Sequence, residues 1–214
     1  MGMHQFIQGL SNLETLRRAP GFFKYQEHSV AAHSFKVAEI AQMLGDVEEL
    51  AGNKVNWQML YEKSLNHDYT ERFIGDIKTP VKYATPTLRH MLADVEATMT
   101  ENFIKNEIPR DFQDRYRRLS EGKDETLEGQ ILSVADKIDL LYEGFGEIEK
   151  GNPEQVFLDI YSESLSTILQ FRNRPSVRYF LEEVLPDMLD EKFASRDQLA
   201  KLTKETMAEH EPNK

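Results

Sequence analysis

The chain has 214 residues, no cysteine, and 26 basic against 37 acidic side chains, which gives a formal net charge of −11 at pH 7. The length suits one domain with a substantial core, and the lack of cysteine excludes disulfides and thiolate metal ligands. The acidic balance argues against polymeric nucleic acid or an anionic membrane as partner, and with no secretory signal or membrane-spanning apolar run we expect a cytoplasmic protein.

Apolar residues recur at helical spacing from the N-terminus onward. A first helix that ends before Pro20 is predicted by Phe6, Leu10, Leu13 and Leu16. Ser29 is placed to cap a second helix, whose apolar stripe is Val30, Val37, Ile40, Ala41 and Leu44. Asn56 precedes a third helix. Thr85 and Pro86 mark the start of a fourth, because proline is favoured at the first helical position.

The second half of the chain is also helical in pattern. A short helix is expected after Pro109, and a long one is predicted by Leu127, Ile131, Val134, Ile138, Leu141, Phe145 and Ile148. Asn152 precedes a proline that should open the next helix, Pro175 and Pro186 should bracket another, and Ser195 should cap the last. No segment alternates as a strand would, so the sequence predicts an all-α fold.

The domain organisation follows from the same patterns. We expect one domain over residues 1–214, with a catalytic core over about residues 1–150. The helices of residues 151–208 should pack on that core, and residues 209–214 should be frayed.

The stretch SLNHDYTERFIGD, residues 64–76, gathers metal-type ligands. On a helix His67 and Asp68 point about 100° apart and could approach one ion from neighbouring directions. Glu71 shares that side, because it lies four residues after His67 and three after Asp68. The alternative is a solvated polar helix end. Since two ligands hold a divalent ion poorly, others must come from elsewhere in the chain.

Two further candidates fall on other predicted helices. His33 lies toward the apolar face of the second helix, where a hydrogen-bonded core histidine is the alternative. Asp136 lies within the apolar long helix, and a carboxylate buried there needs a cation or hydrogen-bond donors. The alternatives are a salt bridge to Arg or Lys, and Asp139 as the competing carboxylate.

The order His33, His67-Asp68, Asp136 resembles the metal motif of the HD-domain phosphohydrolases. The likeness extends to the bacterial YfbR-like HD-domain 5′-deoxynucleotidases over about residues 3–190. It is carried by LRRAP (16–20), AAHSFKVA (31–38), NHDYTERFIGDIKTPVKY (66–83) and SVADKIDLL (133–141). The resemblance implies an HD-domain helical bundle with additional C-terminal helices.

The resemblance also implies a metal site and a catalytic group. The ligands of one divalent ion would be His33, His67, Asp68 and Asp136. This mixed nitrogen and oxygen set suits Mn²⁺, Co²⁺, Fe²⁺ or Zn²⁺ better than Ca²⁺. Glu71 matches no ligand position, and the resemblance gives it the task of positioning the attacking water and handling its proton, next to Asp68 in the catalytic centre.

Substrate contacts are implied at three positions. Arg18 resembles a phosphate-binding arginine, although a basic residue in the last turn of the first helix would also favour the helix dipole. Asp76 resembles the residue that contacts the sugar hydroxyl, and Lys82 is a second candidate for the phosphate. Relatives often have tryptophan where this chain has Ala19 and glutamate where it has Ala32, which leaves the choice of sugar and base open.

Phe22, Phe23 and Tyr25 could supply an aromatic contact for a base, and we expect at least two of them to belong to the core instead. Taken together, the resemblance implies metal-dependent hydrolysis of a (deoxy)nucleoside 5′-monophosphate, a small-molecule substrate, to nucleoside and phosphate. The alternatives are another HD-type phosphohydrolase acting on a nucleoside di- or triphosphate or a cyclic nucleotide, and a non-catalytic nucleotide-sensing module. Relatives with this architecture are often dimers, so a homodimer is one option.

Overall fold

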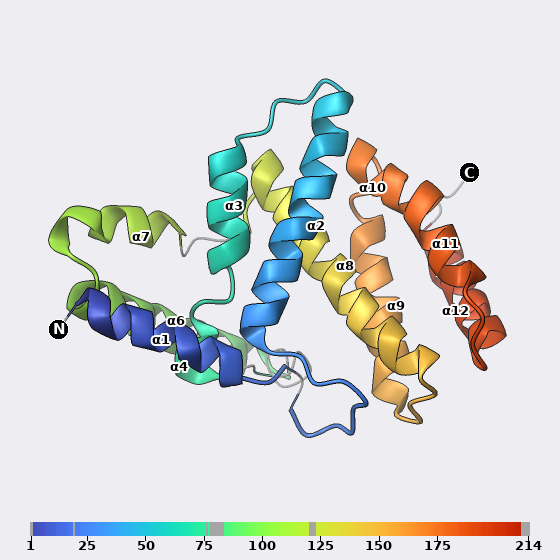
Figure 1. The fold of residues 1–214 in the computed structure, drawn as a ribbon, viewed down its shortest axis with the longest axis horizontal. Helices are drawn as coiled ribbons and strands as arrows, with labels where there is room; N and C mark the ends of the chain where they lie inside the picture. The colour runs from blue at the N-terminus through green and yellow to red at the C-terminus, as the bar shows by residue number, and fades with distance from the viewer. Residues whose placement is uncertain (1, 19, 76, 78–83, 120–122, 211–214) are drawn as a thin grey trace. The chain divides into compact units, whose positions relative to one another are not determined.

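The fold is helical throughout the part of the chain that the computed structural model describes (Figure 1). Described are residues 2–18, 20–75, 77, 84–119 and 123–210. These residues form no β-strand, and the one isolated bridge among them is antiparallel and joins Arg17 to Ser29. The predicted all-α fold is therefore confirmed. None of the helices in the described ranges combines the length and the apolar character needed to cross a bilayer.

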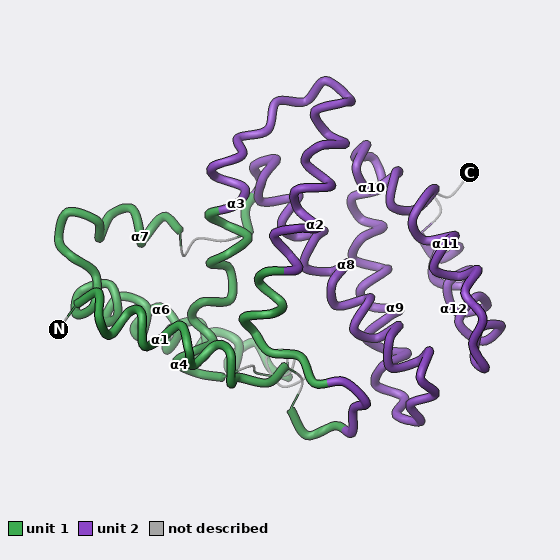
Figure 2. The backbone as a smooth tube through the Cα atoms, in the orientation of Figure 1, with its two compact units in different colours: residues 1–22, 27–35, 62–124 green, residues 23–26, 36–61, 125–214 purple. Residues whose placement is uncertain are grey.

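The chain divides into two compact units (Figure 2). Unit 1 comprises residues 1–22, 27–35 and 62–124, and unit 2 comprises residues 23–26, 36–61 and 125–214. Helices α2 (Val30–Leu50) and α3 (Trp57–Asn66) contribute residues to both units. The expected single domain, with its core ending near residue 150, stays a prediction.

Unit 1 is built around aromatic side chains. Its other helices are α1 (Met3–Thr15), α4 (Glu71–Ile74), α6 (Pro86–Glu107), a 3-10 turn (Arg110–Phe112) and α7 (Gln113–Leu119). The Phe6 ring of α1 lies 6.2 Å from the Phe103 ring of α6 and 5.7 Å from the Tyr69 ring. The apolar cluster thus joins α1, α4 and α6.

Unit 2 contains the larger apolar core. Its remaining helices are α8 (Leu127–Glu149), α9 (Gln155–Leu169), α10 (Pro175–Tyr179), a π-helical turn η2 (Phe180–Val184), α11 (Leu185–Asp190) and α12 (Arg196–Glu209). Figure 1 shows α9 beside α8, and α12 also packs on α9. The close approach of α8 and α9 depends on Gly144, because a Cβ at that position would lie 3.0 Å from the Phe157 carbonyl oxygen.

The starts of three helices were predicted correctly from the residues that precede them. The Ser29 hydroxyl accepts a hydrogen bond from the Ala32 backbone N–H at 3.2 Å. The Thr85 hydroxyl accepts from the Leu88 N–H at 3.1 Å, with Pro86 in the first turn of α6. Asn56 Oδ1 likewise accepts from an N–H of α3, that of Met59, at 3.1 Å. Each side chain satisfies a backbone donor that the helix itself leaves unpaired.

At two other predicted helix starts the side chain makes a different hydrogen bond from the expected one. Asn152 does not open α9 directly: its Oδ1 accepts from the Glu154 N–H at 3.0 Å, a local turn that delays the helix to Gln155. Ser195 precedes α12, but its hydroxyl donates to the Ile148 carbonyl at 3.1 Å instead of capping. The competing hydrogen bond thus delays the start of α9 but leaves the start of α12 where it was predicted.

Pro186 does not close a helix as predicted. The chain passes from α10 through η2 into α11, with Pro186 in the first turn of α11. A proline ring clashes with the carbonyl four residues earlier and cannot donate to it. The wider π turn that precedes it in η2 relieves this conflict, so the helical path continues.

Candidate metal centre

His33 is presented by the first turn of α2. The Ser29 cap begins the helix, and the Ser29 carbonyl accepts from the His33 backbone N–H at 3.0 Å. Val30 and Val37, which lie three residues before and four after His33, are fully buried, and so is His33 itself. The prediction from apolar spacing that His33 points into the protein is therefore confirmed.

His67 and Asp68 follow directly on the last residue of α3. His67 Nδ1 lies 2.8 Å from the Ser64 carbonyl oxygen, which can only accept a hydrogen bond. Nδ1 must then carry the proton, and Nε2 of the neutral ring keeps a lone pair for a metal or a donor. Ser64 was not singled out in the sequence, although its place one helical turn before His67 is a usable signal.

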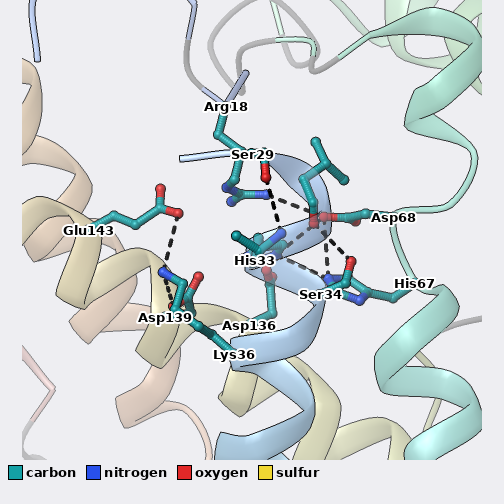
Figure 3. A network of polar contacts seen from close by, with 12 residues as sticks. Arg18, Ser29, His33, Ser34, Lys36, His67, Asp68, Asp136, Asp139 and Glu143 are labelled. Carbon is teal, nitrogen blue, oxygen red and sulfur yellow. Dashed lines mark hydrogen bonds and ion pairs between the residues drawn. The ribbon is translucent and has the colours of Figure 1, made fainter. Parts of the chain in front are cut away.

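Three donor atoms of unit 1 converge on one another (Figure 3). His33 Nε2 lies 3.1 Å from His67 Nε2 and 3.2 Å from Asp68 Oδ2, and His67 Nε2 lies 3.3 Å from that same oxygen. Ligands bound to one ion at about 2.0–2.2 Å are separated by about 3.0–3.4 Å from each other. These three atoms are thus spaced as ligands of a single divalent ion, and His33, His67 and Asp68 together could hold one.

The Asp68 carboxyl is held in its charged form. Burial by itself raises the pKa of Asp68, but the neighbouring His67 and His33 rings outweigh that effect and hold the pKa well below its usual value. An ionised carboxylate is the form that binds a cation. Asp68 therefore offers a charged oxygen to a cation.

Arg18 lies beside this group (Figure 3). Its Nη1 is 3.3 Å from Asp68 Oδ2, and the side chain is buried. Backbone pairing places it: the Arg18 N–H donates to the His28 carbonyl at 3.0 Å, and the Val30 N–H donates to the Leu16 carbonyl at 3.0 Å. Because α1 ends at Thr15, the alternative that placed Arg18 in its last turn is wrong.

Glu71 is the first residue of α4. Its backbone N–H donates to the Asp68 carbonyl at 3.1 Å, so a single turn links the two residues. Its Oε2 atom is shielded from solvent. Gly75 ends α4 with φ +77°, a backbone conformation that favours glycine, and donates its N–H to the Glu71 carbonyl at 2.7 Å. Among the described residues, Glu71 is not part of any cluster of three side chains that are spaced to bind a metal ion.

Asp136 and Asp139 lie on α8, in unit 2, and both are buried. Asp139 Oδ1 lies 2.7 Å from Lys36 Nζ, which also approaches Glu143 at 3.8 Å (Figure 3). The competing carboxylate thus has a lysine partner. Asp136 Oδ2 lies 3.6 Å from Lys137 Nζ. Its place as a metal ligand stays a prediction.

The remaining sequence candidates divide into two sets. Asp76 and Lys82 lie outside the described residues. Of the three loop aromatics, Phe23 and Tyr25 are each 54% exposed, with ring centroids 5.0 Å apart. The expectation that at least two of the three belong to the core is wrong, because the loop they occupy lies on the surface, where apolar side chains need no partner helix.

The chain is similar over most of its length to proteins of known family. A sequence profile described as YfbR-like 5′-deoxynucleotidase matches residues 5–188. A 5′-deoxynucleotidase of Vibrio vulnificus (strain YJ016) is 28% identical over 184 residues, which are 85% of this chain and 92% of that protein.

Solved structures extend the comparison. The crystal structure of an HD-domain phosphohydrolase from Listeria innocua is 63% identical, with a TM-score of 0.93 over 98% of this chain and all (100%) of the other. A cyanophage S-2L HD phosphohydrolase bound to dA and one catalytic Zn²⁺ ion is 18% identical, with a TM-score of 0.50 over 94% of this chain and 96% of that one. The second likeness is one of fold alone. Because the profile spans most of the sequence, this chain belongs to the YfbR-like 5′-deoxynucleotidase family of HD-domain proteins.

Proposed function

We propose that this protein is a metal-dependent phosphohydrolase that cleaves (deoxy)nucleoside 5′-monophosphates to nucleoside and phosphate. Family membership supports the reaction type, and the Vibrio relative carries the name 5′-deoxynucleotidase. The observation that carries the proposal is the triangle of donor atoms formed by His33, His67 and Asp68, with edges of 3.1, 3.2 and 3.3 Å.

The residues fit a divalent ion, and we propose Asp136 as the fourth ligand. The resemblance to the family motif supports Asp136, while Lys36 Nζ lies 2.7 Å from Asp139 and Lys137 Nζ lies 3.6 Å from Asp136. Two imidazoles and two carboxylates suit Mn²⁺, Co²⁺, Fe²⁺ or Zn²⁺. When bound, such an ion supplies polarisation of a phosphoryl oxygen and a lower pKa for a nearby water.

The protein's own side chains would perform the other tasks. Glu71 would accept a proton from the water whose oxygen attacks phosphorus, while the bond from phosphorus to the ester oxygen breaks and that oxygen takes up a proton. Arg18 would bind the phosphate dianion through its guanidinium, whose planar donors match phosphate oxygens. Asp76 would contact the sugar hydroxyl, as the family resemblance implies, and Lys82 is a second, weaker candidate for the phosphate.

A reconstitution assay tests the function. Metal-free protein is supplied in turn with Mn²⁺, Co²⁺, Fe²⁺ and Zn²⁺ and offered all deoxy- and ribonucleoside 5′-monophosphates, with nucleoside di- and triphosphates and a cyclic dinucleotide as competing classes. We expect phosphate and nucleoside from monophosphates only, and no product with His67→Ala. Turnover confined to one of the other classes, or tight nucleotide binding without turnover under every metal, would contradict the proposal. The cytoplasmic location and the homodimer stay predictions.

A further inference from the structure

The residues that join the metal centre to Glu71 form consecutive tight turns. Backbone N–H groups donate to carbonyls three residues earlier, from Tyr69 to Asn66 at 3.1 Å, from Glu71 to Asp68 at 3.1 Å and from Arg72 to Tyr69 at 3.4 Å. In such turns side chains three positions apart lie above one another. Asp68 and Glu71 therefore share one side of the segment, and Tyr69 and Arg72 share another.

Arg72 is fixed on that second side by several contacts at once. Its guanidinium carbon lies 5.0 Å from the Tyr69 ring, 4.6 Å from the Phe73 ring and 5.0 Å from the Phe103 ring. Its Nη2 donates to both carboxylate oxygens of Glu107, at 2.7 and 2.8 Å, and its Nη1 donates to the Tyr69 hydroxyl. The side chain is only 7% exposed. A buried guanidinium paired and stacked in this way has little freedom to move.

These contacts tie the segment to two long helices of unit 1. Phe103 and Glu107 belong to α6, and Gly9 of α1 lies so close that an added Cβ would overlap the Arg72 guanidinium. Thr70 makes a second tie to α6 by donating to Glu96 Oε1 at 2.7 Å. The four-residue helix α4 is too short to be stable by itself. The place of Glu71 must therefore come from such anchors.

We propose that Arg72 is a positioning residue for the hydrolysis, whose buried contacts with Tyr69, Phe103 and Glu107 keep Glu71 at a fixed place relative to Asp68. The inference rests on the proposed function, because it acts through the proton-accepting role of Glu71. A displacement of about 1 Å in a catalytic group can cost up to a hundredfold in rate.

Two variants disturb the anchor in different ways. Arg72→Lys keeps the charge but loses the planar donors. Gly9→Ala leaves Arg72 itself unchanged but places a methyl group where its guanidinium lies. In the metal-loaded enzyme, measured well below each unfolding temperature and per folded molecule, we expect kcat to fall by about tenfold to a hundredfold. KM and the amount of bound metal should stay within about threefold of the wild type, because the ligands and Arg18 are unchanged.

The chain offers matched controls for both variants. Arg117 also donates twice to a glutamate of α6, Glu101, at 3.1 and 3.0 Å. Its side chain, however, is 39% exposed, and Arg117 lies outside the segment of residues 68–73. Arg117→Lys should keep kcat. Gly146→Ala adds a methyl group whose nearest neighbour outside the helix backbone is Lys150 Nζ, at 3.7 Å, and it should also keep kcat.

A double-mutant cycle decides between positioning and general structural support. If Arg72 acts through Glu71, then Arg72→Lys combined with Glu71→Gln should have the kcat of Glu71→Gln alone. Losses that multiply would overturn the inference, as would an unchanged kcat in both Arg72→Lys and Gly9→Ala. If Arg72→Lys fails to fold, Glu107→Gln and Gly9→Ala carry the same cycle. A wild type that is inactive with every metal is a separate outcome, which overturns the proposed function and this inference with it.

Discussion

At the scale of single residues, the site depends on which atom each side chain offers. The Ser64 carbonyl holds the proton of His67 on Nδ1 and so turns the Nε2 lone pair toward His33 and Asp68. Arg18 approaches the same Asp68 oxygen at 3.3 Å. A cation bound by Asp68 would therefore compete with the Arg18 guanidinium for the same oxygen, and that guanidinium would attract a phosphate bound nearby.

Glu71→Gln tests the proton acceptor. The amide keeps the size of the side chain but cannot take up a proton, so we expect kcat to drop by about a hundredfold to ten-thousandfold. Metal content, measured by elemental analysis of the dialysed protein, should match that of the wild type. Equal loss of metal and activity would instead make Glu71 a ligand.

Arg18→Met tests the phosphate contact. Removing a charge-assisted hydrogen-bond donor costs about 1.5–3 kcal/mol of binding, so KM should rise by at least tenfold. Arg17→Met is the matched control, because Arg17 is the exposed neighbour in the same bridged segment. Steady-state kinetics on both variants check this, and an equal effect of the two substitutions would contradict a specific role for Arg18.

At the scale of elements, helix starts follow local cap chemistry, while helix packing depends on small residues at particular places. Ser29, Asn56 and Thr85 each satisfy a backbone N–H of the helix they precede. Gly144 permits α8 and α9 to approach, and it lies on the apolar face of α8, three residues after Leu141 and four before Ile148, whereas Gly146 does not.

Gly144→Ala should destabilise the protein. The added Cβ would meet the Phe157 carbonyl oxygen at 3.0 Å, and backbone cannot move aside as cheaply as a flexible side chain. Overpacking of this kind costs about 1–3 kcal/mol. Gly146→Ala would place its Cβ in ordinary van der Waals contact with Lys150 Nζ, at 3.7 Å, and should be neutral or stabilising by up to about 1 kcal/mol. Urea unfolding of the two variants beside the wild type measures the contrast, which equal free energies would refute.

Glu147 joins the loop of residues 23–26 to the end of α8. Its two carboxylate oxygens accept from the Tyr25 and Gln26 N–H groups, both at 2.9 Å, and from Asn152 Nδ2 at 2.7 Å. Burial alone raises the pKa of Glu147, but the donors of Tyr25, Asn152 and Gln26 bring that pKa below its usual value. The stabilisation is therefore complete above the unfolded-state pKa and is lost as the pH falls through the lower folded-state pKa.

Glu147→Gln should lower the free energy of unfolding by about 1–3 kcal/mol at pH 7, because backbone donors lose a charged acceptor. The difference from the wild type should shrink as the pH falls through the lowered pKa of the folded-state carboxyl, where the wild-type side chain also becomes neutral. Unfolding curves at several pH values check the sign. A difference that grew on acidification would show that Glu147 is not held in its charged form.

At the scale of the whole molecule, metal binding should be visible as stability. A ligand that binds only the folded protein at a hundred times its Kd adds about 2.7 kcal/mol to the free energy of unfolding. Mn²⁺ or Co²⁺ should therefore raise the unfolding temperature of the wild type and leave that of His67→Ala unchanged, as measured by calorimetry. An equal rise in both proteins would point to ions bound elsewhere on a chain of net charge −11.

The sequence by itself determined the all-α class, most helix starts, and the residues His33, His67, Asp68 and Glu71 as candidates. These depend on periodicity, caps and neighbours within a turn, which are local properties of the chain. It misjudged Phe23, Tyr25 and Pro186, whose surroundings are set by other parts of the fold.

Only the tertiary structure decided that His33 meets a histidine 34 positions away, that Lys36 takes Asp139, and that Arg72 is enclosed by aromatic rings. Such contacts depend on which helix faces pack together, a choice made by the summed burial of many side chains rather than by any short stretch. A sequence can therefore name the ligands of a site, but the spacing between them follows from packing.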